Sequence, residues 1–209
     1  MPDSSVEFAS LLCSRLCHDL LSPVGAMNNG LELLTDEDDP AMRARCMELL
    51  VDSARASADR LKFYRLAFGA AGGFGDEIAV TEIRAAIEGV VRGNAKVELG
   101  WMVALPTLSK AAAKILLNLA MIALDGLVRG GRLDIGAEAG EVVIRAEGAR
   151  LVFDPGVRAV LAGDAGKTEV TARTSAAWLV RHLVAEGGGR IKVADEEPGV
   201  LLLAAALPG

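Results

Sequence analysis

The chain has 209 residues, of which 52% are hydrophobic, 24% charged and only 4% aromatic, and its formal net charge is −6. This length fits one large domain or two small ones, and the abundance of Ala, Leu and Val favours helices packed through aliphatic side chains. The acidic balance and the lack of a basic run argue against a nucleic-acid partner, and no apolar run reaches the roughly 18 residues of a membrane span.

The first third of the sequence predicts two long helices. One runs over about residues 5–34 and contains Pro23, where we expect a local kink. An acidic loop over residues 35–40 breaks the pattern, and a second helix follows over about residues 40–68. Two long helices joined by a short loop form an αα-hairpin. Because a hairpin cannot cover its own apolar stripe, we expect a twofold dimer with a four-helix bundle.

Beyond a glycine-rich linker at residues 69–75, the sequence changes to mixed helices and strands. The predicted helical segments are 81–92, 109–128, 155–161 and 174–186, and the predicted strands are 97–103, 133–137, 142–146, 150–153, 190–195 and 199–206. Helices packed on one face of a mostly antiparallel sheet form an α/β sandwich. We therefore predict an α+β chain with a hairpin domain over residues 1–70 and a sandwich domain over residues 76–209.

His18 is one of only two histidines in the chain and lies within the first predicted helix. At about 100° per residue, the centre of that helix's apolar stripe lies almost opposite His18. The stripe consists of Leu12, Leu16, Leu20, Val24, Met27, Leu31 and Leu34. An accessible imidazole beside the carboxylate of Asp19 is suited to carry a phosphoryl group. The alternative is a core histidine, and it better describes His182, which we expect to be partly buried.

The helix face around His18 supplies further candidate site residues. Arg15 precedes His18 by three positions, which would place its cation near the ring. Gly25 lacks a side chain and would let another surface approach. The face also includes Leu11, Ser14, Leu21, Ser22, Asn29 and Glu32. Arg15 and Asp19 could instead be ordinary charges on a solvated face.

Three cysteines, Cys13, Cys17 and Cys46, cannot pair evenly. Cys13 and Cys17 lie one helical turn apart, which suits two metal ligands, but His18 faces elsewhere and no second histidine is near. We therefore expect no metal site and reduced, half-buried thiols. The first residues lack the basic region and apolar core of a signal peptide, so we expect a cytoplasmic protein.

Residues 18–23, His-Asp-Leu-Leu-Ser-Pro, resemble the phosphoacceptor box of sensor histidine kinases. In that box an acidic residue follows the histidine, and a proline comes five positions after it. The chemistry explains these residue types. Asp19 can accept a proton from one ring nitrogen of His18, which leaves the other nitrogen free to attack a phosphoryl group.

The second half resembles the ATP-binding domain of histidine kinases, the Bergerat fold, with losses. Kinases carry an Asn-Leu-x-x-Asn-Ala box, of which this chain keeps Asn118 but has Ile122 in place of the second asparagine. Residues 154–158, Asp-Pro-Gly-Val-Arg, keep only the first half of an Asp-x-Gly-x-Gly box.

Residues 174–191 follow the second glycine box and its helix most closely. Thr174 and Ala176 stand where the two glycines of that box would be, and a Cβ there obstructs the approach of a phosphate to the backbone amides. The segment between the two glycine boxes is also short. We therefore expect a retained fold with a lost nucleotide site.

A phosphoacceptor hairpin joined to a degenerate kinase-like domain is the plan of the ChpT-type histidine phosphotransferases, and this chain is similar to them over nearly its whole length. Residues 62–69, which end the second predicted helix, add to the resemblance. It implies that His18 shuttles a phosphoryl group between receiver-domain aspartates, in a relay with response regulators and a hybrid histidine kinase. It also implies a homodimer that needs no cofactor, since Mg²⁺ would arrive with the receiver.

In this hypothesis His18 and Asp19 are the catalytic residues, and Arg15 would ease charge build-up on the phosphoryl oxygens. The predicted partner-binding residues are Leu11, Arg15, Ser22, Gly25 and Asn29. No residue is assigned to a cofactor or a metal. Two alternatives stay open: an ATP-dependent sensor histidine kinase core, and a non-catalytic adaptor that has kept the fold.

Overall fold

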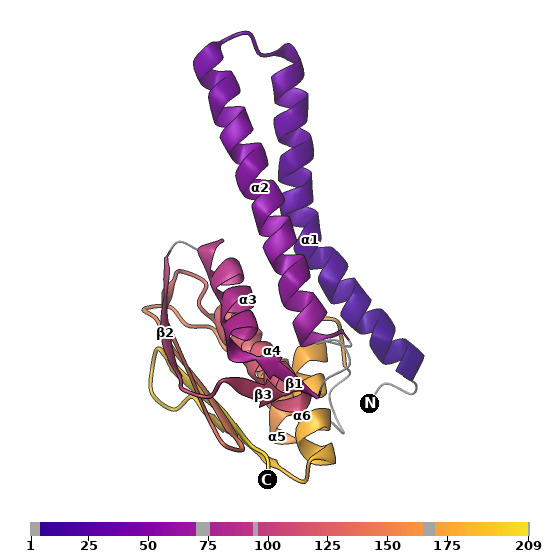
Figure 1. Cartoon of the computed structure of the whole chain (residues 1–209), viewed down its shortest axis with the longest axis vertical. Coiled ribbons are helices and arrows are strands. Elements are labelled where there is room, and N and C mark those ends of the chain that lie inside the picture. The colour runs from indigo at the N-terminus through magenta and orange to yellow at the C-terminus, as the bar shows by residue number, and fades with distance from the viewer. Residues whose placement is uncertain (1–4, 70–75, 94–95, 165–169, 209) are drawn as a thin grey trace.

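The computed structural model describes residues 5–69, 76–93, 96–164 and 170–208. It shows a long helical stem whose lower end packs against an α/β body (Figure 1). Residues 70–75 of the predicted linker and residues 165–169, between the two glycine boxes, lie outside the described residues. Within the part of the chain that is described, no helix is both long enough and apolar enough to span a membrane.

The stem is the predicted hairpin of α1 (Ser5–Asp36) and α2 (Pro40–Ala67). The side chain of Asp39 accepts hydrogen bonds from the backbone N–H groups at the start of α2, and Pro40 takes its first position, so the helix begins where the sequence indicates. Pro23 lies inside α1, which stays continuous but changes direction part-way along its length (Figure 1). A proline accounts for such a bend because it removes one helical hydrogen bond.

The stem leaves much of its apolar surface uncovered. Val24 and Leu31 belong to the stripe predicted for the first helix, yet both are exposed, and Leu31 is 56% exposed. Met42 and Leu49 are exposed on α2. In α1, only Pro23 and Gly30 are fully buried. The predicted apolar stripe is therefore only partly buried within a single hairpin.

The body contains one five-stranded sheet with the order β2-β4-β5-β7-β6. Its strands are β2 (Val97–Val103), β4 (Gly131–Glu138), β5 (Glu141–Glu147), β6 (Arg190–Ala194) and β7 (Val200–Ala206). β2 runs parallel to β4 and the other three pairs are antiparallel, as expected for a mostly antiparallel sheet. Alternate residues such as Leu133, Ile144 and Leu203 are fully buried on one face.

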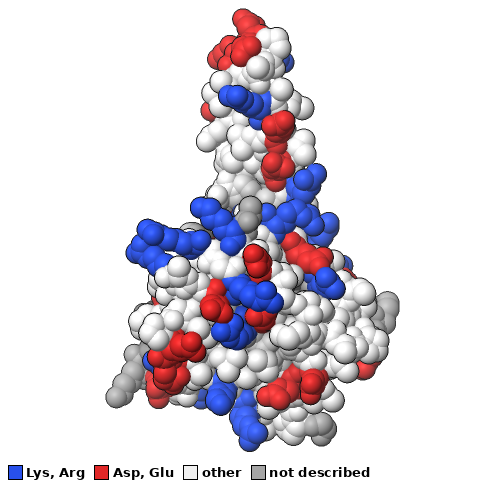
Figure 2. Space-filling view, turned by 90° about the vertical axis from the view of Figure 1, so that its left-hand side faces the viewer, with Lys and Arg blue, Asp and Glu red and all other residues white. Residues whose placement is uncertain are grey.

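Four helices cover one face of this sheet (Figure 1). They are α3 (Val80–Arg92), α4 (Lys110–Gly126), α5 (Pro155–Ala162) and α6 (Ser175–Glu186). α4 is central and contacts β5, α6 and the stem helix α2. Charged side chains gather where the stem meets the body (Figure 2). Two ion pairs, Arg65–Glu82 at 2.8 Å and Arg92–Asp59 at 3.3 Å, join α2 to α3 in this region.

The structure corrects three expectations. Residues 150–153 form no strand, because the backbone N–H of Val152 donates to the carbonyl of Gly126 and the segment follows the end of α4. A small second sheet pairs β1 (Glu77–Ala79) with β3 (Thr107–Ser109), which the sequence analysis did not anticipate. The side chain of His182, expected to be partly buried, is 49% exposed, and its ring stacks on that of Trp178 with ring centroids 5.0 Å apart.

Candidate functional site

His18 projects from α1 into solvent beside the body. Its side chain is 83% exposed, so the alternative of a core histidine is wrong. Nδ1 of His18 lies 3.1 Å from Oδ1 of Asp19. A proton on Nδ1 is held by this carboxylate, which leaves the lone pair on Nε2 free toward solvent. This is the geometry of an imidazole that attacks through Nε2.

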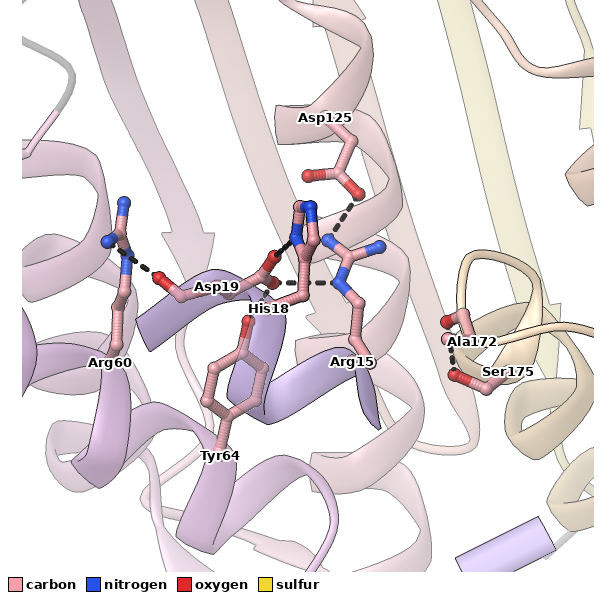
Figure 3. A network of polar contacts seen from close by, with 8 residues as sticks. All are labelled: Arg15, His18, Asp19, Arg60, Tyr64, Asp125, Ala172 and Ser175. Atoms are coloured by element: carbon pink, nitrogen blue, oxygen red, sulfur yellow. Dashed lines mark hydrogen bonds and ion pairs between the residues drawn. The ribbon is translucent and has the colours of Figure 1, made fainter. Parts of the chain in front are cut away.

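Asp19 is the centre of a polar network (Figure 3). Its Oδ2 accepts hydrogen bonds from Nε of Arg15, at 2.7 Å, and from the hydroxyl of Tyr64. Arg60 donates to its backbone carbonyl at 2.9 Å. Partial burial alone would raise the pKa of Asp19, but the hydrogen bonds from Tyr64 and His18 and the charge of Arg15 lower that pKa overall. Asp19 therefore stays ionised and able to hold the imidazole proton.

Arg15 connects the network to the body. Its Nη2 lies 2.7 Å from Oδ2 of Asp125, near the end of α4. The Arg15 side chain is only 12% exposed. Desolvation alone would lower the pKa of Arg15, but the facing carboxylates of Asp125 and Asp19 raise it further above its ordinary value. Arg15 is thus a permanent cation that pairs with two carboxylates. From the sequence, its charge was expected to face the phosphoryl oxygens.

The other predicted partner-binding residues lie along α1. Ser22 and Asn29 are exposed and Leu11 is half-buried. A Cβ added to Gly25 would meet no atom within 4 Å, so this face is open as predicted. The structure brings Arg15, His18 and Asp19 together, whereas Gly25 and Asn29 lie farther along the helix.

The cysteines differ in part from expectation. Cys46 is buried, but Cys13 and Cys17 are exposed and not half-buried, because they lie on the outer surface of α1. Among the residues that the structure describes, no group of three or more His, Cys, Asp or Glu side chains is arranged to hold a metal ion.

A pocket of about 460 Å³ lies between α1 and the body. His18 and Asp19 line one wall, and Asp154 and Ala176 line another. The positions that resemble the glycine boxes of kinases therefore face the histidine across this pocket.

The polar residues of the kinase-like boxes serve the fold. The carboxylate of Asp154 caps α5 by accepting from the backbone N–H groups of Gly156 and Val157, and it pairs with Arg173 at 2.9 Å. At the second box, the hydroxyl of Ser175 donates to the carbonyl of Ala172 at 2.7 Å (Figure 3).

Asn118, the residue kept from the kinase asparagine box, is fully buried. Its Nδ2 donates to the carbonyl of Ala67, at the end of α2, and to the carbonyl of Lys114 within α4. Its Oδ1 is buried without a hydrogen-bond partner. Asn118 thus ties the stem to the body.

Sequence reasoning missed three members of the network. They are Tyr64, Arg60 and Asp125, and none of them received an individual role. The one available signal for Tyr64 was its place within residues 62–69, which carry part of the family resemblance. Nothing in the sequence marked Asp125.

Comparisons with known proteins agree with this architecture. A family model described as the histidine phosphotransferase C-terminal domain matches residues 80–199. The chain is 36% identical over 198 residues to the protein phosphotransferase ChpT of Brucella abortus (strain 2308), with 91% of each protein covered. The chain belongs to the histidine phosphotransferase family.

Solved structures extend this result. A bacterial phosphotransferase superposes on this histidine phosphotransferase with a TM-score of 0.83 and 32% identity, covering 97% of both chains. The histidine kinase domain of a blue-light activated kinase from Erythrobacter litoralis gives a TM-score of 0.46 at 10% identity, over 88% of this chain and 95% of that one. The predicted family, α+β fold class and phosphotransferase activity are confirmed.

Proposed function

We propose that this histidine phosphotransferase relays a phosphoryl group between the aspartates of two receiver domains through Nε2 of His18. The observation that carries the proposal is an exposed imidazole whose Nδ1 lies 3.1 Å from an ionised carboxylate, that of Asp19. The donor would be a receiver loaded by a hybrid histidine kinase, and the acceptor a response regulator.

The transfer is a pair of in-line displacements. The lone pair of Nε2 forms a bond to phosphorus, and the bond between phosphorus and the donor's carboxyl oxygen breaks, which releases the donor carboxylate. The imidazole gains positive charge in this step, and Asp19 stabilises that charge through the Nδ1 proton. The second step reverses the first toward the acceptor. We expect Mg²⁺ to be supplied by the receiver.

The receiver would dock on the open face of α1. Ser22 and Asn29 are exposed there, and the space over Gly25 admits another backbone. Leu11 would contact the receiver on the other side of His18. Arg15 lines the pocket beside His18 and would lie close to the incoming phosphoryl group.

We further propose that the relay does not use ATP. The carboxylate of Asp154 caps a helix, the Nδ2 group of Asn118 bonds the end of the stem, and Ala176 is almost fully buried where a glycine would be needed. At the described residues of the two boxes, these features argue against a backbone cradle of the kind that holds nucleotide phosphates.

The exposed apolar surface of the stem supports a homodimer. Val24 and Leu31 lie seven residues apart on α1, and Met42 and Leu49 lie seven apart on α2. Such spacing repeats along one side of a helix and is typical of bundle seams. A second copy packed there would complete a four-helix bundle. The three free cysteines suit a reducing compartment, so we expect this assembly in the cytoplasm.

The test is incubation with a receiver domain carrying labelled aspartyl phosphate, followed by mass analysis for acid-labile phosphate. We expect the label on His18, none on His18→Ala, and normal labelling of His182→Ala, which removes the only other histidine. Transfer between two receivers that survives His18→Ala would leave the adaptor alternative. Labelling by ATP alone, or micromolar ATP binding, would favour the kinase alternative. Analytical ultracentrifugation of the full chain and of Leu31→Glu tests the dimer.

A further inference from the structure

Four charged or ionisable side chains form one continuous chain from the body to the histidine (Figure 3). Asp125 lies 2.7 Å from Arg15, Arg15 lies 2.7 Å from Asp19, and Asp19 lies 3.1 Å from Nδ1 of His18. We propose that Asp125, in the C-terminal domain, is a positioning residue for phosphoryl transfer at His18. The inference rests on the proposed role of His18.

The first step is that Asp125 fixes Arg15. An arginine side chain has many rotamers, and a guanidinium becomes fixed only when its planar donors meet acceptors in more than one direction. Arg15 uses Nε for Asp19 and Nη2 for Asp125, and its stem is mostly buried. Loss of Asp125 would remove one of the two anchors, so the Arg15 side chain could leave the rotamer in which its Nε faces Asp19.

The second step is that Arg15 fixes Asp19. The two oxygens of Asp19 have separate partners: Oδ2 accepts from Arg15 and Tyr64, and Oδ1 faces His18. Two donors from different helices on Oδ2 determine the rotation of the carboxylate and therefore the place of Oδ1. An Arg15 side chain in another rotamer would leave Tyr64 as the single donor to Oδ2.

The third step is that His18 depends on Asp19 for its orientation. Because the ring is 83% exposed, packing restrains it little. Within the described residues, the contact with Asp19 is the one hydrogen bond that the His18 ring makes. A displaced Oδ1 would therefore loosen the ring and reduce the share of molecules with the proton on Nδ1 and the lone pair on Nε2.

The body holds the backbone of Asp125 in place. Asp125 follows the buried segment of α4 that forms the centre of the body, and Asn118 of the same helix bonds the end of α2. The C-terminal domain thereby contributes to the chemistry at His18 as well as to docking.

The test compares Asp125→Ala and Asp125→Asn with Glu82→Gln in the full-length protein. Glu82→Gln removes the negative charge from another stem–body ion pair, the 2.8 Å contact with Arg65, which lies outside the His18 network. Single-turnover transfer from a phosphorylated receiver is measured over a range of receiver concentrations. We expect Asp125→Ala to lower the rate at saturation by about tenfold, within the up to hundredfold loss caused by misplacing a reacting group by about 1 Å.

The half-saturating receiver concentration should stay unchanged in Asp125→Ala, and Glu82→Gln should transfer at the wild-type rate. Asp125→Asn keeps an acceptor oxygen for Arg15 and should lose less than Asp125→Ala, and it is the variant to use if Asp125→Ala unfolds. Nitrogen NMR of the His18 ring should show a smaller share of the Nδ1-protonated tautomer in Asp125→Ala.

A double variant separates positioning from stability. If Asp125 acts through Asp19, adding Asp125→Ala to Asp19→Asn should cause no further loss of rate. The inference would be overturned if the two substitutions caused additive losses of rate, or if Glu82→Gln lost as much rate as Asp125→Ala. It would also be overturned if Asp125→Ala changed only the half-saturating receiver concentration, or left the share of the Nδ1-protonated tautomer of His18 unchanged. If instead the proposed role of His18 is wrong, His18→Ala would still transfer phosphoryl groups between receivers, so the two failures are distinguishable.

Discussion

Tyr64 of α2 and Asp19 of α1 are joined by a hydrogen bond whose acceptor, Oδ2, is the carboxylate oxygen that does not face His18. The hydroxyl thus orients the carboxylate without competing with the imidazole for it. Each partner changes the acidity of the other. The hydrogen bond helps to lower the pKa of Asp19, and burial followed by the same bond raises the pKa of Tyr64.

The first prediction uses the fact that Tyr64 is the only tyrosine. Spectrophotometric titration of the native protein should show tyrosinate forming well above the ordinary pKa of about 10. Asp19→Asn should shift this titration toward 10, because the neighbouring negative charge is removed while the burial remains. Since the pKa of Tyr64 is raised on folding, native stability should fall as the pH rises above about 10. Ionisation of wild-type Tyr64 near 10, or no change in Asp19→Asn, would contradict the assigned contact.

The second prediction concerns acid stability. The lowered pKa of Asp19 stabilises the fold at pH values above the unfolded pKa of about 3.9, and this contribution is lost as the pH falls through the lower folded value. Tyr64→Phe removes one hydrogen bond to a charged group and should cost about 1–2 kcal/mol at pH 7. Urea unfolding at pH 7, 5 and 3 should show the wild-type advantage shrinking at the lowest pH. A pH-independent difference would mean that Tyr64 contributes packing alone.

The sequence predicted those parts of the molecule that depend on local pattern. Helical periodicity placed His18 opposite the apolar stripe, and the ring is exposed. The break in the pattern at the acidic loop over residues 35–40 predicted where α2 begins. The 18–23 box predicted the contact between His18 and Asp19, and Nδ1 of His18 lies 3.1 Å from Oδ1 of Asp19.

The parts that the sequence did not predict depend on contacts between segments that are distant in the chain. Tyr64 meets Asp19 only because the register of α1 against α2 brings them together, and its position within one helix gives no sign of that contact. Asp125 of α4 meets Arg15 of α1 where the stem packs against the body, 110 residues apart in the chain. β1 and β3 have three residues each, too few for a two-residue period to be recognised.

The third prediction compares two glycines in the interior of α1. A Cβ at Gly25 would meet no atom, whereas one at Gly30 would lie 3.2 Å from the side chain of Leu50. Gly25→Ala should therefore stabilise the protein by about 0.5–1 kcal/mol through helix propensity, and Gly30→Ala should gain less or lose stability. Thermal unfolding of both variants measures this.

Gly25 also allows a test of the docking face. Gly25→Trp should leave the fold intact, since its side chain points into open space, but should raise the receiver concentration needed for half-maximal transfer. Unchanged transfer by Gly25→Trp would place the docked receiver elsewhere on the stem.

The final prediction concerns Asn118, whose side chain joins the carbonyl of Ala67 to α4. If Asn118 is a structural tie, Asn118→Ala should lower the free energy of unfolding by about 1–3 kcal/mol, because the buried carbonyls of Ala67 and Lys114 lose a donor. Asn118→Asp should cost more, since a carboxylate in the same buried place must either ionise there or bind a proton. Urea unfolding measures both losses, and Lys114→Ala, which keeps its backbone carbonyl, serves as the control. Full stability of Asn118→Ala, together with the loss of ATP-analogue binding that the wild type possessed, would instead mean that the asparagine has kept a nucleotide-binding role.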